Sequence, residues 1–369
     1  MSPSAQEGAL SALTNGVEIG FKGHTSDEGW MRPEEFVGLL FFLLLLVMSM
    51  AHRVPVFEPM RRSRLTYFTA VLFVLMLLGY TGWHFVNNRF LRREGERIQN
   101  ATFFNRLFGV VRDWLPAVIC LGIYESLKHL HLNEIIFWLG ITPKDHWMIR
   151  ADEFLVGFHA SVALEHIISD TMTWYMRMVY YYGYYLYPAI VGVFLYLWRP
   201  RRAFRELVVA FLACAFIGYA IYILVPVAGP RLSHIQYQYT IPLSASGTLE
   251  TMQMDTLRYQ YDCFPSLHTA IPLTVLVVAY RHSWKLAIVL TPFVLSTVFS
   301  TLYLRMHYLI DVVAGIALVP FCVFLGIKVD GWWCKIHRRA IRGMSTKLGW
   351  VFHSLLGLVA TLWLVSLIR

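Results

Sequence analysis

The chain has 369 residues, of which 57% are hydrophobic and only 15% are charged. This composition is too apolar for a soluble globular protein, so we expect an integral membrane protein. The net charge of +9 could suggest nucleic-acid binding, but the basic residues cluster between apolar segments. That distribution is typical of membrane topology, so we expect no nucleic-acid partner.

Apolar segments follow one another along the whole chain. They lie at 36–51, 65–86, 114–128, 174–198, 204–226, 266–281, 285–304, 307–328 and 351–368. A transmembrane helix needs about 20 apolar residues, with about 17 as the usual lower limit. The second, fourth, fifth and eighth segments satisfy this rule, whereas the first is short and the third contains Pro116 and Glu125. The sequence therefore predicts an all-α fold, a polytopic transmembrane helical bundle.

The segments suggest three regions. We expect residues 1–113 to form a polar N-terminus with two accessory membrane segments, and residues 114–328 to form a six-span catalytic core. Residues 329–369 would be a basic cytoplasmic linker and a C-terminal membrane segment. No small-residue cleavage site follows the first apolar run, so we expect no cleaved signal peptide.

Lysine and arginine alternate in density between the gaps. Six lie in 87–113 and six in 328–347, and the denser side should be cytoplasmic. Four arginines between 53 and 64 oppose this pattern, unless segment 36–51 does not cross the membrane. This topology places the loop 227–265 on the extracytoplasmic or luminal face, together with the turn at 305–307.

Two short stretches contain the candidate catalytic groups. Phe264-Pro265-Ser266-Leu267-His268 precedes one apolar segment, and Arg305-Met306-His307-Tyr308-Leu309-Ile310-Asp311 precedes another. His307 and Asp311 are four residues apart, so they share one helix face. A histidine held by a carboxylate can attack phosphorus, while a second histidine protonates the leaving group. We therefore expect His307 as nucleophile, Asp311 as its orienting carboxylate and His268 as general acid and base.

In this order, the two stretches resemble the second and third signatures of the type 2 phosphatidic acid phosphatase superfamily. The resemblance covers about 150–328. It implies a membrane enzyme that breaks a lipid phosphoester through a phosphohistidine intermediate. Its partners would be a lipid phosphate or phospholipid substrate and the membrane lipids. No cofactor or metal is implied, because arginines and histidines supply the charge, and the oligomeric state is left open.

Phosphoryl transfer needs cations around the phosphate oxygens. The superfamily's first signature, K-x6-R-P, is absent. The stretch 225–231 instead resembles the equivalent element of the inositol phosphorylceramide synthase branch, so Arg231 is the first candidate. Ser266 precedes a helix, where its hydroxyl and nearby N–H groups can hold phosphate oxygens. Where the third signature usually has Ser-Arg this chain has Ser-Thr, which adds Thr301 and the nearby Arg305 as candidates.

The stretch 152–157 resembles a D-x-x-L-x-G element of the same branch. Together with Thr301 and the Arg231 element, it favours an inositol phosphorylceramide synthase-like head-group transferase. A lipid phosphate phosphatase, of phosphatidic acid or polyprenyl phosphate type, remains the alternative. A non-catalytic lipid carrier or scramblase is a third hypothesis, but it would not need the pair His307 and Asp311.

Three further features are less specific. The five cysteines match no zinc-site spacing, and Cys263 is expected to pack near the site. The tyrosines between 180 and 187 indicate either an interfacial aromatic belt or the wall of a head-group site. Apolar residues at helical spacing predict a helix over 152–168 that lies along the membrane surface.

Overall fold

A computed structural model of the chain describes residues 139–243 and 261–340, with 109–117 and single residues at 32, 35, 36, 120 and 136. The chain divides into two compact units, one made of 1–23 and 130–340 and the other of 24–129 and 341–369. The predicted segments 65–86 and 351–368 lie outside the described residues, as do 36–51 apart from Phe36 and most of 114–128.

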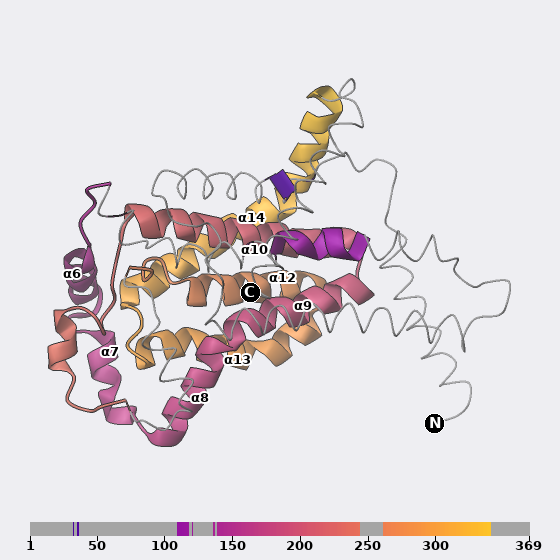
Figure 1. Cartoon of the computed structure of the whole chain (residues 1–369). Helices are drawn as coiled ribbons and strands as arrows, with labels where there is room; N and C mark the ends of the chain where they lie inside the picture. Colours follow the sequence, from indigo (N-terminus) through magenta and orange to yellow (C-terminus); the bar gives the residue numbers. More distant parts are fainter. Residues whose placement is uncertain are drawn as a thin grey trace, which may run out of the picture. The chain divides into compact units, whose positions relative to one another are not determined.

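The described part of the first unit is helical, without a named strand. Its elements in chain order are α6 (Asp145–Val156), α7 (Ala160–Ala163), η3 (Leu164–Ile167), α8 (Asp170–Tyr181), α9 (Gly183–Trp198), α10 (Arg201–Leu224), η4 (His234–Gln238), α12 (Leu267–His282), α13 (Trp284–Tyr303) and α14 (Leu309–Ala340). The long helices run side by side as a bundle, with α6 and α7 at one end (Figure 1). The predicted all-α fold is thus confirmed for these residues.

Three of these helices are long and apolar enough to cross a membrane. They span Arg201–Leu224, Trp284–Tyr303 and Leu309–Val329, while the apolar helix α9 is shorter. The protein is therefore a membrane protein, as the composition predicts. A core of six spans stays a prediction.

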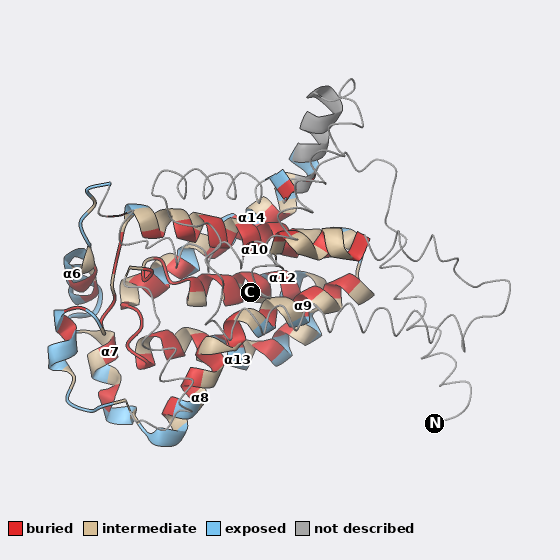
Figure 2. Cartoon of the chain, viewed as in Figure 1, coloured by how far each residue is buried: buried red, intermediate tan, exposed pale blue. Residues whose placement is uncertain are grey.

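Helix α12 lies at the centre of the bundle, because it packs against α9, α10, α13 and α14. Its residues Ala270, Ile271, Val275 and Val278 are fully buried. Figure 2 shows buried residues along the facing sides of the bundle helices and exposed residues at the end formed by α6 to α8. Val277 and Tyr280 of the same helix are exposed, so its continuous apolar run after His268 covers a packed side and an exposed side.

Two predicted helices are interrupted. The segment 174–198 is divided between α8 and α9 at Tyr182, so it is not one continuous span. The predicted helix over 152–168 also breaks, because Gly157 ends α6 in the left-handed conformation with φ 76°. Glycine adopts this conformation without steric cost and commonly ends helices in this way. Residues 160–167 then form α7 and η3.

The loops that carry the two histidine stretches meet at one end of the bundle. The Ser266 N–H donates to the Asp311 carbonyl oxygen over 3.0 Å, and the Cys263 N–H donates to the Val227 carbonyl oxygen over 3.1 Å. Gly315 allows α14 to approach α12, since a Cβ there would lie 2.6 Å from the Ser266 carbonyl oxygen. Segments distant in the chain are thus brought beside His307.

Candidate active site

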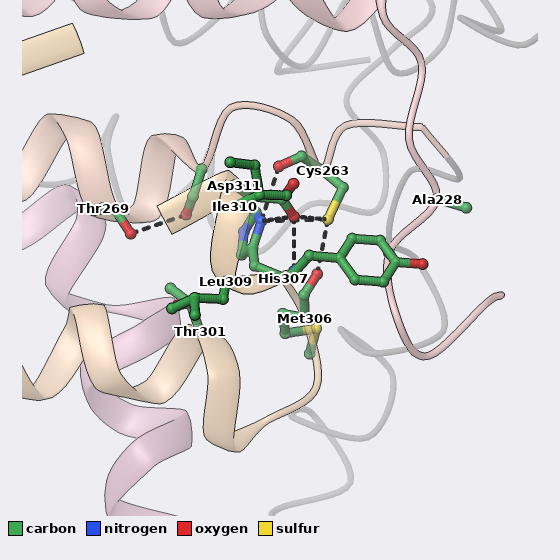
Figure 3. Close-up of polar contacts among 12 residues, drawn as sticks. Ala228, Cys263, Thr269, Thr301, Met306, His307, Leu309, Ile310 and Asp311 are labelled. Carbon is green, nitrogen blue, oxygen red and sulfur yellow. Dashed lines mark hydrogen bonds and ion pairs between the residues drawn. The ribbon is translucent and has the colours of Figure 1, made fainter. Parts of the chain in front are cut away.

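His307 lies in the turn between α13 and α14 and is buried. Its Nδ1 is 2.9 Å from the Cys263 carbonyl oxygen and 3.5 Å from Asp311 Oδ2 (Figure 3). A carbonyl oxygen can only accept, so Nδ1 is the protonated nitrogen and the lone pair is on Nε2. The structure therefore brings the predicted pair together, but the nearest acceptor for Nδ1 is a backbone carbonyl.

Asp311 organises the first turn of α14. Its Oδ2 accepts the Tyr308 N–H over 2.8 Å and the Cys263 thiol over 3.0 Å. A side chain in the first turn that accepts the N–H just before its helix is half of a capping box. Asp311 thus stabilises the helix start and places a negative charge near the imidazole of His307.

Cys263 contacts both members of this pair. Its Sγ lies 3.3 Å from His307 Nδ1 and 3.1 Å from the Met306 carbonyl oxygen, a second acceptor for the single thiol proton. The side chain is fully buried, and its position two residues before Pro265 was the only sequence signal for a place near the site.

A metal ion could use the same three side chains. Among the described residues, the ligand atoms of Cys263, His307 and Asp311 lie within 4.8 Å of one another. Thiolate, imidazole and carboxylate are the groups that bind zinc. In this structure Nδ1 of His307 faces a carbonyl oxygen, so it would have to lose its proton and turn toward the ion before it could ligate one.

His268 lies in the first turn of α12, and its ring centroid is 6.0 Å from that of His307. Its ring stacks on Tyr180, with centroids 3.9 Å apart and planes at 9°, and Tyr184 lies 4.8 Å away. These tyrosines of α8 and α9 therefore form a wall of the site. Reacting atoms need to approach to about 3–3.5 Å, and the two histidine rings are near enough for both to reach a single phosphoryl group.

Ser266 and Thr301 are both fully buried. Ser266 occupies the N-cap position of α12 without a side-chain capping bond, and its hydroxyl accepts from Thr269 Oγ1 over 3.1 Å. The Thr301 hydroxyl donates to the Val298 carbonyl oxygen over 2.6 Å within its own helix. The Thr301 carbonyl accepts the His307 N–H over 3.1 Å, so its clearest contact with the site is through the backbone.

A tight loop places Arg231 against the turn that carries His307. Its Nη1 lies 3.6 Å from the Sδ of Met306, the residue before His307. Gly229 has φ 92°, and a Cβ on it would come within 2.8 Å of the Met306 carbonyl oxygen and 2.9 Å of Cys263 Sγ. Only glycine allows this loop to pack so closely against the turn that carries His307.

Arg305, by contrast, is engaged in an ion pair. Its Nη2 donates to Glu165 Oε1 over 2.7 Å and to the Ile241 carbonyl oxygen, and its guanidinium lies 3.9 Å from the Tyr239 ring centroid. Its φ of 60° is unusual for a residue other than glycine. Arg305 thus joins η3 to the loop after η4. A phosphate could bind this guanidinium only in competition with the Glu165 carboxylate.

Burial shifts the pKa values around this ion pair. Burial alone would raise the pKa of Glu165, but hydrogen bonds from Thr240 and Ile241 and the charge of Arg305 lower it overall. Burial lowers the pKa of Arg305, an effect that Glu165 opposes. Burial also raises the pKa of Tyr239 to about 12. Glu165 and Arg305 thus form an ionised pair, and the phenol of Tyr239 beside them is neutral.

Sequence reasoning also missed a buried cation on α8. Arg177 lies on the same helix face as Thr173 and Tyr180, and all three are buried. Thr173 Oγ1 is 3.0 Å from the Tyr303 hydroxyl, and Tyr180 stacks on His268. A single arginine in an apolar segment has no spacing signal, so only the packing of α8 reveals where it lies.

Part of the chain matches a known protein family. Residues 146–325, a little under half of the chain, match the family model described as the PAP2 superfamily. The match includes both histidine stretches and Arg231. No curated protein and no solved structure matches the chain. The match supports a phosphatase or phosphotransferase enzyme that acts on lipid phosphates.

Proposed function

We propose that the protein transfers a phosphate-containing head group from one lipid to another through a phosphohistidine formed on His307, as an inositol phosphorylceramide synthase would. The observation that carries this proposal is the orientation of His307. Its Nδ1 is bound 2.9 Å from the Cys263 carbonyl oxygen, so Nε2 is the nucleophilic nitrogen, and the His268 ring lies 6.0 Å away.

In the first step, Nε2 of His307 attacks the phosphorus of the donor lipid. The new P–N bond forms as the P–O bond to the leaving alcohol breaks, and protonated His268 gives its proton to the departing oxygen. The imidazole of His307 gains positive charge during this step. The Cys263 carbonyl and the Asp311 carboxylate, 3.5 Å from Nδ1, favour that charge.

In the second step, neutral His268 removes the proton of an acceptor hydroxyl. The acceptor oxygen attacks phosphorus, the P–N bond breaks, and His307 is regenerated with its lone pair. Arg231 is our first choice for the phosphate oxygens, with the hydroxyls of Ser266 and Thr301 beside them. Arg305 remains a candidate only if phosphate displaces Glu165.

The first experiment separates transfer from hydrolysis. Purified protein is incubated with labelled phosphatidylinositol, alone and with ceramide or diacylglycerol as acceptor. A transferase makes a new phospholipid and hydrolyses the donor slowly without acceptor. Rapid release of inositol phosphate that is indifferent to acceptor would instead support hydrolysis of the lipid phosphate phosphatase kind, which the superfamily match equally allows.

The second experiment tests the intermediate. A quench in alkaline SDS after mixing with 32P-labelled lipid should trap base-stable, acid-labile label on the wild-type protein and none on His307→Ala. A folded His307→Ala protein with wild-type turnover would refute the mechanism. If neither the wild-type protein nor His307→Ala turned over any lipid phosphate, that result would instead favour a non-catalytic carrier or scramblase.

A further inference from the structure

Two aspartates of α6 lie on the face that packs against the rest of the unit. Asp145 and Asp152 are seven residues apart, which is two helical turns, so they share this face. Each carboxylate accepts two consecutive backbone N–H groups from a different loop of the site. None of the candidate roles assigned to the histidine stretches includes either side chain.

Asp152 holds the start of α14. Its Oδ2 accepts the Leu309 N–H over 2.9 Å and its Oδ1 accepts the Ile310 N–H over 2.8 Å. The first N–H groups of a helix have no partner within the helix. With Asp311 accepting the Tyr308 N–H, two carboxylates hold the three residues that follow His307. Asp152 thereby fixes the backbone from which His307 projects.

Asp145 holds the loop of Arg231. Its Oδ2 accepts the Ala228 N–H over 3.0 Å and its Oδ1 accepts the Gly229 N–H over 2.9 Å. The Tyr308 hydroxyl also donates to Oδ1 over 3.0 Å. Asp145 therefore joins the loop that ends in Arg231 to the residue directly after His307.

We propose that α6 is a positioning helix for the phosphoryl transfer, in which Asp152 sets the place of His307 and Asp145 sets the place of Arg231. This inference rests on the roles proposed above for those two residues. Hydrogen bonds to a charged carboxylate are stronger and more directional than neutral ones, so each aspartate holds two amides in one geometry. The positioning role also accounts for the first and last residues of the D-x-x-L-x-G element. Its aspartate, Asp152, caps α14, and its glycine, Gly157, ends α6.

The two aspartates should have different kinetic signatures. Asparagine keeps the shape of the side chain but replaces one acceptor oxygen with a donor that opposes a backbone N–H. Residues that orient a reacting group typically affect activity by about 10- to 100-fold. We expect Asp152→Asn to lower kcat by about that factor with little change in KM. Asp145→Asn should mainly raise KM, by about 10-fold, because it loosens the loop of the phosphate-binding arginine.

The assay uses the full chain purified in detergent and the substrate that the wild type turns over, dioctanoyl phosphatidic acid or phosphatidylinositol with ceramide. Glu153→Gln is the matched control, since it makes the same charge change on the neighbouring residue of α6, whose side chain is 54% exposed. Thermal unfolding is measured for every variant. We expect Glu153→Gln to keep wild-type kcat and KM.

Wild-type kcat in folded Asp152→Asn would overturn the inference, and so would equal changes of kcat and KM in both asparagine variants. If Asp152→Asn does not fold, Asp152→Ser replaces it, since a serine hydroxyl can accept one N–H as in an N-cap. Failure of both to fold would assign Asp152 to stability alone and also overturn the proposal. His307→Ala is assayed in parallel: its activity would refute the proposed function, whereas an inactive His307→Ala beside a normal Asp152→Asn would refute only the positioning role.

Discussion

Replacing Gly229 with alanine tests how closely the Arg231 loop must approach His307. Gly229 has φ 92°, and the added Cβ would lie 2.8 Å from the Met306 carbonyl oxygen and 2.9 Å from Cys263 Sγ. Real Cβ atoms essentially never approach other atoms this closely. The loop or the turn that carries His307 must therefore move.

The expected cost has two parts. A left-handed backbone costs a residue with a Cβ about 1–2 kcal/mol, and overpacking in a dense interior costs about 1–3 kcal/mol. Gly229→Ala should thus destabilise the protein by about 2–5 kcal/mol. A displacement of about 1 Å at a reacting group can cost about 100-fold in rate, so we expect a fall in kcat/KM of about 10- to 100-fold.

The variant Gly140→Ala separates the cost of the left-handed backbone from the cost of overpacking. Gly140 has φ 67°, but nothing lies within 4 Å of a Cβ placed on it. This variant should therefore show only the backbone cost and keep wild-type kcat/KM. Thermal unfolding in detergent and turnover of the lipid substrate are measured for both variants. Equal stability losses, or wild-type activity in Gly229→Ala, would refute the close packing of the loop against His307.

Three further predictions concern chemistry, topology and pH. His268→Gln should slow the release of poor alcohol leaving groups far more than that of a nitrophenolate, because only the former need a proton; equal slowing would contradict its role as acid. A cysteine replacing Tyr237, which is 83% exposed, should label with an impermeant maleimide from the luminal or extracytoplasmic side, and labelling from the cytoplasmic side would reverse the predicted topology. The folded-state pKa of Glu165 is lowered from 4.5, so its ionised form stabilises the fold above about pH 4.5, and this contribution is lost as pH falls through the folded-state value. Unfolding temperatures of wild type and Glu165→Gln should accordingly differ most near neutral pH and converge in acid; a pH-independent difference would exclude this linkage.

The amino-acid sequence determined the class of this protein. The apolar composition, with charges clustered between apolar segments, predicts a membrane protein, and three helices of the described residues are long and apolar enough to cross a membrane. The spacing of His307 and Asp311 predicts a shared helix face. The two side chains do come within 3.5 Å, but His307 lies in the turn before α14, which begins at Leu309. The two histidine stretches indicated the superfamily that the match over 146–325 supports. The synthase branch stays a prediction.

The tertiary structure decided the contacts between residues far apart in the chain. The acceptor of His307 Nδ1 is a carbonyl 44 positions away, and no periodicity encodes that pairing. Arg305, a predicted phosphate ligand, is bound to Glu165 140 positions earlier, since burying an arginine requires a nearby carboxylate. Asp152 likewise caps a helix that begins 157 positions later. Local spacing predicts which groups share a helix face, but only the packing of α6, α12 and α14 determines which distant groups complete the site.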